Sequence, residues 1–278
     1  MRTFSIKGVF FAKGAFFVAR ILVPGMMISA VLFCQPGYAG CSAESMDDYA
    51  SVYSIVDGDT IRLGNQKLVR LIGINTPEID YDGDVSEPLA HTAKQFLISQ
   101  LGTRRRIGLV YEQESQDRHG RRLAHVFVVE DGVYRNVQQR LLENGLAFWV
   151  AIPPNTHYLD CYRSAESTAK LQGIGIWREV YFQPRQATDE HNLIAGFQLL
   201  QGKIVSTYKS KNAFWLKFND TVALRIADKD IHNFKVSALE ALKGKTVTAR
   251  GWLYKHKNRL TMQIRHPASI ELPPQAAS

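Results

Sequence analysis

The sequence predicts a mainly β, α+β fold: a five-stranded OB-type Greek-key barrel with added helices, followed by a second small OB-like barrel. The main observation is an element order that occurs twice, in which three strand candidates are followed by a helix and two further strands. The 278 residues also exceed one typical domain. With 45% apolar and 22% charged residues the chain is globular, which excludes general disorder, a collagen-like fibre and a polytopic membrane protein.

Short apolar or alternating segments between turn residues predict the strands of the first barrel. Asp57-Gly58-Asp59 and Gly64-Asn65 are the turn signals that separate the first three strands. The five predicted strands cover residues 51–56, 60–63, 67–74, 106–111 and 123–129.

Three segments of this first half have helical features. Residues 87–101 place apolar side chains on one helical face. Residues 137–144 form a short helix that Gly145 terminates. A third helix begins near Asn155 or Thr156 and extends to about residue 171.

The second barrel follows a segment of low periodicity, and we place the linker at residues 186–195. This gives a first domain at 40–185 and a second at 196–278. The second domain has five predicted strands and one short helix, at 197–206, 213–219, 221–226, 236–242 (the helix), 245–254 and 259–264.

Residues 1–39 have the features of a secretory signal peptide, with four basic residues and no acidic one before a short apolar segment. That segment, 21–34, is shorter than the roughly 20 residues that a membrane-spanning helix needs. We expect cleavage after Ala39, export to the periplasm or the medium, and no integral membrane association afterwards. An uncleaved anchor and a lipoprotein modified at Cys41 remain alternatives. Export into an oxidising compartment would allow a disulfide between Cys41 and Cys161; two free thiols are the alternative.

The net charge of +8 is unevenly distributed. Residues 40–185 carry 16 basic and 19 acidic side chains, whereas residues 186–278 carry 14 basic and 7 acidic ones. A basic domain favours a nucleic acid or another anionic partner, and here only the second domain is basic.

Three polar clusters at strand ends or loops in the first domain combine oxygen ligands, an additional carboxylate and guanidinium groups. Oxygen ligands suit Ca²⁺ or Mg²⁺, and paired Arg side chains suit a phosphate. Together they suit metal-assisted hydrolysis of a phosphodiester, although each cluster alone would read as an ordinary turn or solvated surface. The clusters are residues 57–60, Arg70 with residues 75–78, and residues 117–122.

The segment from about Val52 to Glu179 resembles the staphylococcal nuclease family. Six pieces occur in the family's order: residues 56–60, 70–78, 117–121, 145–147, 155–157 and 175–177. The resemblance implies an OB barrel and a Ca²⁺-dependent endonuclease that cuts DNA and RNA to leave 3′-phosphates.

The resemblance also implies roles for individual residues. Glu78 would act as the general base on water, and Arg70 and Arg121 would hold the phosphate and stabilise its developing charge. The metal ligands would be Asp59, Asn75 and the Thr76 carbonyl, with Asp57 close by. Arg118 and His119 would contact the substrate.

Two features depart from the family pattern. Asn75 stands where the family usually has Asp, which predicts weaker Ca²⁺ binding because affinity depends on ligand charge; Mg²⁺ is an alternative metal. Asp80, Asp82 and Asp84 alternate after Glu78, as a second Ca²⁺ site or as a solvated acidic loop.

The second domain contains aromatic residues interleaved with basic ones, a composition with which OB folds hold single-stranded nucleic acid. We expect substrate contacts from Lys209, Trp215, Trp252 and Lys255. The alternative is that the rings fill the barrel core.

An exported, monomeric nuclease is therefore the function that the sequence favours, with nucleic acid as its partner. A catalytically weak or inactive module that binds nucleic acid or protein is the first alternative, but Arg70, Glu78 and Arg121 are all retained. A phosphoesterase for small substrates is the second alternative, and the basic second domain argues against it.

Overall fold

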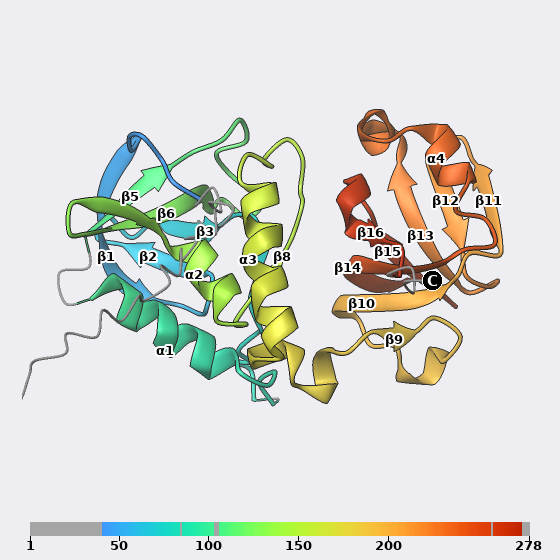
Figure 1. The fold of residues 1–278 in the computed structure, drawn as a ribbon, viewed down its shortest axis with the longest axis horizontal. Coiled ribbons are helices and arrows are strands. Elements are labelled where there is room, and N and C mark those ends of the chain that lie inside the picture. The colour runs from blue at the N-terminus through green and yellow to red at the C-terminus, as the bar shows by residue number, and fades with distance from the viewer. Residues whose placement is uncertain (1–40, 84, 103–105, 257, 274–278) are drawn as a thin grey trace, which may run out of the picture. The chain divides into compact units, whose positions relative to one another are not determined.

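A computed structural model describes residues 41–83, 85–102, 106–256 and 258–273 (Figure 1). All the described residues belong to one compact unit. The predicted signal peptide at 1–39 and Asp84 of the acidic loop lie outside the described residues. Among the helices that are described, none is long and apolar enough to cross a membrane.

The first five long strands form a closed barrel of mixed strand direction, as the sequence predicts. The first strand, β1, uses its first half to pair with β5 and its second half to pair with β2. The parallel pairing of β3 with β6 closes the barrel. These strands are β1 (Asp48–Ile55), β2 (Thr60–Leu63), β3 (Leu68–Leu71), β5 (Arg106–Val110) and β6 (Arg122–Glu130).

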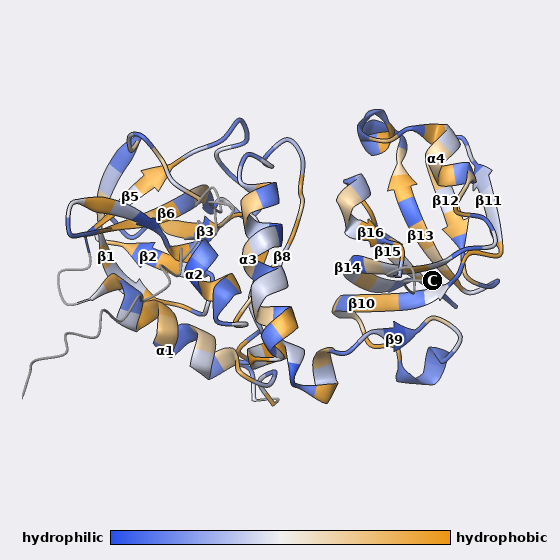
Figure 2. Ribbon diagram, in the orientation of Figure 1, coloured by the Kyte–Doolittle hydropathy of each residue, from blue (hydrophilic) through white to orange (hydrophobic). Residues whose placement is uncertain are grey.

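Alternating side chains fill this barrel, since successive residues of a strand point to opposite faces. Ile61, Val69, Leu109 and Val126 are fully buried in one core cluster. Figure 2 shows β5 mainly in hydrophobic colours. Three shorter strands surround the barrel: β4 (Ile74–Asn75) pairs with β8 (Phe148–Trp149), and β7 (Val133–Asn136) extends β6 as a hairpin.

Three helices pack on this barrel, α1 (Ala90–Leu101), α2 (Val137–Glu143) and α3 (Leu159–Gln172). The Asn136 side chain caps α2 by accepting a hydrogen bond from the Gln139 N–H. A disulfide joins Cys41 to Cys161 of α3, which decides between the two alternatives left by the sequence. Two 3-10 turns follow α3, at Gly175–Trp177 and Val180–Phe182.

The second barrel has the same strand connectivity as the first. Strand β10 pairs with β14, and β11, which follows β10 in the chain, pairs with β12. Together, β10 and β11 therefore correspond to β1, whose two halves pair with β5 and β2. The parallel pairing of β13 with β15 corresponds to that of β3 with β6. The strands are β10 (Gly196–Lys203), β11 (Ser206–Lys209), β12 (Ala213–Lys217), β13 (Val222–Ala227), β14 (Thr246–His256) and β15 (Arg259–Gln263).

The single strand expected at 197–206 is thus two strands, because the chain changes its pairing partner from β14 to β12 at Ile204 and Val205, which belong to neither strand. Short elements complete the domain. They are the helix α4 (Val236–Glu240), the strand β16 (Ile270–Glu271) and the 3-10 turns Asp228–Asn233 and Pro267–Ser269.

The segment around the predicted linker packs against the second barrel. Strand β9 (Arg185–Gln186) pairs in parallel with β10, and a 3-10 turn covers Glu190–Asn192. Ala187 and Leu193 are buried in the second core. The lack of helical or strand periodicity in this segment therefore reflects an irregular backbone that is packed against the second barrel.

The two barrels also contact each other directly. Phe148 and Ile176 share a small apolar cluster with Leu199 of β10. Arg250 of β14 forms an ion pair with Glu166 of α3, and both side chains are buried. These contacts bring β14 to the first barrel.

Candidate nuclease site

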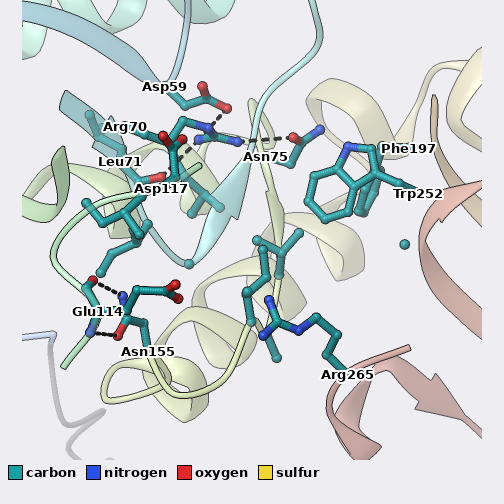
Figure 3. A pocket seen from close by; sticks show the side chains of 18 of the residues that line it. Asp59, Arg70, Leu71, Asn75, Glu114, Asp117, Asn155, Phe197, Trp252 and Arg265 are labelled. Carbon is teal, nitrogen blue, oxygen red and sulfur yellow. Dashed lines mark hydrogen bonds and ion pairs between the residues drawn. The ribbon is translucent and has the colours of Figure 1, made fainter. Parts of the chain in front are cut away.

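A pocket of about 620 Å³ contains most of the predicted site (Figure 3). It is lined from both barrels. Nine of the predicted site residues line it: Asp57, Asp59, Arg70, Asn75, Glu78, Arg118, His119, Arg121 and Trp252. Thr76 is buried beside this group, whereas Lys209, Trp215 and Lys255 lie elsewhere on the second barrel.

The turn between β1 and β2 positions two carboxylates. The Asp57 carboxylate accepts a hydrogen bond from the Asp59 N–H at 3.0 Å, which fixes the turn. A Cβ at Gly58 would lie only 2.7 Å from the Thr76 hydroxyl and 2.8 Å from the Ala93 Cβ. Glycine is therefore needed for the turn to pack closely against Thr76 and helix α1.

Arg70 of β3 links two of the predicted metal ligands. Its Nη1 lies 2.7 Å from Asp59 Oδ2, and its Nη2 donates to Asn75 Oδ1 at 3.2 Å. Figure 3 shows the guanidinium between these two side chains. The Arg70 Nη1 also donates to the Leu71 carbonyl at 2.9 Å, which fixes the orientation of its planar group.

Burial, followed by repulsion from Asp59, raises the pKa of two acids in the pocket, Glu78 and Asp57. The pKa of Glu78 is raised to about 7, first by desolvation and second by repulsion from Asp59. The Glu78 side chain is nevertheless exposed at the pocket. The same two causes raise the pKa of Asp57 to about 6. Such a concentration of negative charge favours binding of a cation, and a carboxyl with a pKa near neutrality suits general base catalysis.

The oxygen atoms of this group fit a hard divalent cation. Asp59 and Asp57 supply carboxylates, Asn75 an amide oxygen and Thr76 a backbone carbonyl. The Thr76 N–H donates to Asp59 Oδ2 at 2.9 Å, which holds the two residues together. Within the described ranges, no three His, Cys, Asp or Glu side chains converge as a ready-made metal centre. The fit therefore depends on the neutral oxygens as well as the acids.

Asp117 organises the loop that carries the second arginine. Its carboxylate accepts hydrogen bonds from the backbone N–H groups of His119 and Arg121, and its Oδ2 lies 2.7 Å from Arg121 Nε. The Arg118 Nε donates to His119 Nε2 at 3.0 Å on the same loop. Asp117 belongs to the motif noted in the sequence but was not assigned a role there.

Glu114 and Asn155 connect two further loops of the pocket. The Asn155 Oδ1 accepts from the Glu114 N–H at 3.0 Å, and its Nδ2 donates to the Glu114 carbonyl at 2.6 Å. Figure 3 shows this reciprocal pair. Through these two bonds Asn155 fastens the chain before α3 to the loop before β6.

The second barrel contributes one wall of the pocket, and Trp252 is the residue of that wall that the sequence predicted. Phe197 and Trp252 contact each other edge to face, with centroids 5.2 Å apart. Arg265 reaches across to the first barrel, since its Nη2 donates to the Pro153 carbonyl at 2.9 Å. Lys229, Gln263 and Arg265 line the pocket as well. No motif in the sequence marks them, because only the packing of the two barrels places them there.

Comparison with known proteins identifies relatives of the first barrel. The model of the family described as staphylococcal nuclease homologue matches residues 68–179. The chain is 34% identical to a thermonuclease of Staphylococcus intermedius over 129 residues, which is 45% of this chain and 74% of that protein. It is 30% identical to a thermonuclease of Staphylococcus hyicus over 142 residues, 50% of this chain and 80% of that protein. Endonuclease YncB of Bacillus subtilis is 33% identical over 127 residues, 44% of this chain and 58% of its own length.

Proposed function

Because the chain belongs to the staphylococcal nuclease family, we propose that it is a metal-dependent endonuclease that hydrolyses phosphodiester bonds of DNA, RNA or both. The observation that carries this proposal is the pocket in which Asp59, Arg70, Glu78 and Arg121 come together. The relatives named thermonuclease and endonuclease support the same reaction.

Ca²⁺ is the metal that we propose, held by Asp59, Asn75 and the Thr76 carbonyl with Asp57 nearby; Mg²⁺ is the alternative. The donor set of hard oxygens supports this assignment. When bound, the cation would neutralise charge on the substrate phosphate.

The side chains would perform the remaining steps. Arg70 and Arg121 would hold the non-bridging phosphate oxygens, where their orientation by Asp59 and by Asp117 limits reorganisation. Glu78 would accept a proton from the attacking water, and its raised pKa suits that task. Attack at phosphorus with departure of the 5′ oxygen gives the 3′-phosphate products that the family resemblance implies.

We further propose that the enzyme is exported and acts as a monomer. The composition of residues 1–39 supports export. The disulfide between Cys41 and Cys161 supports it independently, since structural disulfides persist in oxidising compartments.

Cleavage assays on single-stranded DNA, double-stranded DNA and RNA test the proposal. The purified protein is assayed with Ca²⁺, with Mg²⁺ and with chelator, beside the variants Glu78→Gln and Glu44→Gln; Glu44 is exposed and outside the pocket. We expect cleavage only with metal, a large loss in Glu78→Gln and wild-type rates in Glu44→Gln. Absence of metal-dependent cleavage would favour the inactive binding module, and an undiminished rate in Glu78→Gln would refute the role of that residue.

A further inference from the structure

A single row of outward-facing side chains crosses the sheet of the second barrel. Tyr208 pairs with Trp215, Trp215 with Arg225 and Arg225 with Gln263, each on the neighbouring strand. Directly paired residues point to the same face of a sheet. Their neighbours Leu216, Leu224 and Met262 are buried in the second core, so this row is on the outer face.

The row continues onto the last two strands. Leu253 of β14 pairs with Met262, which places Trp252 and Gln263 at the same level of adjacent strands. Trp252 in turn pairs with Phe197 of β10. The row therefore has one member on each strand of the barrel and follows its curved outer face.

The side chains of the row are arranged as a series of planar groups. The rings of Tyr208 and Trp215 stack with an interplanar angle of 9° and centroids 6.3 Å apart. The Arg225 guanidinium lies 5.9 Å from the Trp215 ring centroid and donates to Gln263 at 2.7 Å. Tyr208 and Trp252 are 45% and 39% exposed, so ring faces remain available to solvent.

One end of the row enters the nuclease pocket. Gln263, Trp252 and Phe197 all line it, opposite Asp59 and Arg70 (Figure 3). Asp230 anchors this end, because its carboxylate accepts from Gln263 Nε2 at 3.3 Å and lies 3.3 Å from Arg265 Nε. This end of the row therefore shares the pocket with the candidate catalytic residues.

We propose that a single strand of nucleic acid lies along this row, with its bases stacked on the rings, and enters the pocket for cleavage. The proposal rests on the proposed nuclease function and adds the strand preference and the path of the substrate. Aromatic rings and an Arg plane hold unpaired bases, whereas a duplex keeps its bases stacked internally. The +7 charge of residues 186–278 supplies attraction for the backbone.

Binding is measured first, so that it does not depend on catalysis. Fluorescence anisotropy of labelled 15-nucleotide oligo(dT) and oligo(U) is recorded with the full chain carrying Glu78→Gln. Trp215→Ala and Tyr208→Ala should each weaken binding about tenfold. Tyr49→Ala, an exposed tyrosine of the first barrel, and Lys243→Ala, an exposed lysine outside the row, should bind as the parent does. Equal affinity in all variants, or preference for a duplex of the same length, would overturn the proposal.

Cleavage then separates this proposal from the proposed function. In the active protein, Trp215→Ala should raise KM for a 15-nucleotide strand and leave kcat/KM for a trinucleotide unchanged. If neither substrate is cut, the nuclease function fails while the binding result still decides the path. If both are cut equally well by the parent and by Trp215→Ala, the path fails and the nuclease function stands.

If the substituted proteins do not fold, cross-linking of the unsubstituted protein tests the same path. Oligonucleotides carrying 5-iodouracil are irradiated with the unsubstituted protein, and the attached peptides are identified by mass spectrometry. Attachment at Trp215, Tyr208 or Trp252 supports the path. Attachment confined to the first barrel contradicts it.

Discussion

Arg250 and Glu166 form a buried ion pair between the two barrels, with Nη1 of the arginine 2.9 Å from both carboxylate oxygens. The guanidinium also lies 3.9 Å from the Trp149 ring centroid, and its Nη2 donates to Glu271 at 3.1 Å. Burial raises the pKa of Glu166 and Arg250 opposes that rise. The arginine therefore compensates a carboxylate that the fold has removed from water.

We expect Arg250→Met to lower the free energy of unfolding by about 3–5 kcal/mol, because it leaves the Glu166 charge buried with the Trp149 N–H but without its cationic partner. Combining it with Glu166→Gln should recover part of the loss. Urea denaturation measures both. Lys217→Met, which removes the exposed ion pair with Asp220, should change stability little. A small effect of Arg250→Met alone would show that the pair is not needed.

Arg70→Lys should lower kcat by about 10²–10³-fold, because lysine lacks the planar group that contacts both Asp59 and Asn75. Arg121→Lys should lower kcat by a similar factor, because Asp117 orients Arg121 through the guanidinium Nε, which lysine lacks. Steady-state kinetics on a single-stranded substrate measures the change. The exposed Arg135→Lys is the control and should match the parent.

Asn75→Asp should strengthen Ca²⁺ binding by roughly tenfold, because calcium affinity increases with the number of charged ligands. Isothermal titration calorimetry of Ca²⁺ without substrate measures the dissociation constant. Gln113→Glu is the control, because Gln113 is exposed whereas Gln138 is buried in the core. Unchanged affinity in Asn75→Asp would rule out this residue as a ligand that limits binding.

Replacing Cys41 and Cys161 together by Ser should lower the free energy of unfolding by about 2–4 kcal/mol, since the bridge closes a long loop. Denaturation with and without reductant provides the check. The parent should lose stability on reduction, and the double variant should show no further loss. If reductant left the parent unaffected, the bridge would not contribute to stability.

Stability should decrease on acidification partly through His125. Burial lowers the pKa of His125 despite its bond to Glu112 at 2.7 Å, so below about pH 6.5 the unfolded chain binds a proton that the folded chain excludes. Burial raises the pKa of Glu112, but its interactions with His125 and with the backbone N–H groups of Thr156 and His157 together outweigh burial and lower that pKa. The stability that Glu112 contributes is therefore lost at still lower pH, in the same direction. Melting temperatures from pH 7 to pH 5 should fall less steeply in His125→Gln than in the parent. Parallel profiles would contradict the assignment.

The sequence predicted the parts of the fold that local patterns determine. Alternation identified the five strands of the first barrel, and Gly145 marked the end of α2. Strands as short as β4 and β8 have two residues each, too few for an alternating pattern to identify them. The residues of the first barrel that line the candidate site could be named from the sequence because they lie in contiguous motifs. Phe197 and Arg265 could not, since they reach the pocket only through contacts between barrels.

The Arg250–Glu166 pair has a consequence for the independence of the nuclease barrel. In this chain α3 carries a carboxylate whose cationic partner is supplied by the other barrel. Removing residues 186–278 would take Arg250 from this acid and Phe197 and Leu199 from the Phe148 ring. The C-terminal barrel is therefore not a detachable accessory, and a truncation intended to isolate the catalytic unit would also have to redesign the surface of α3.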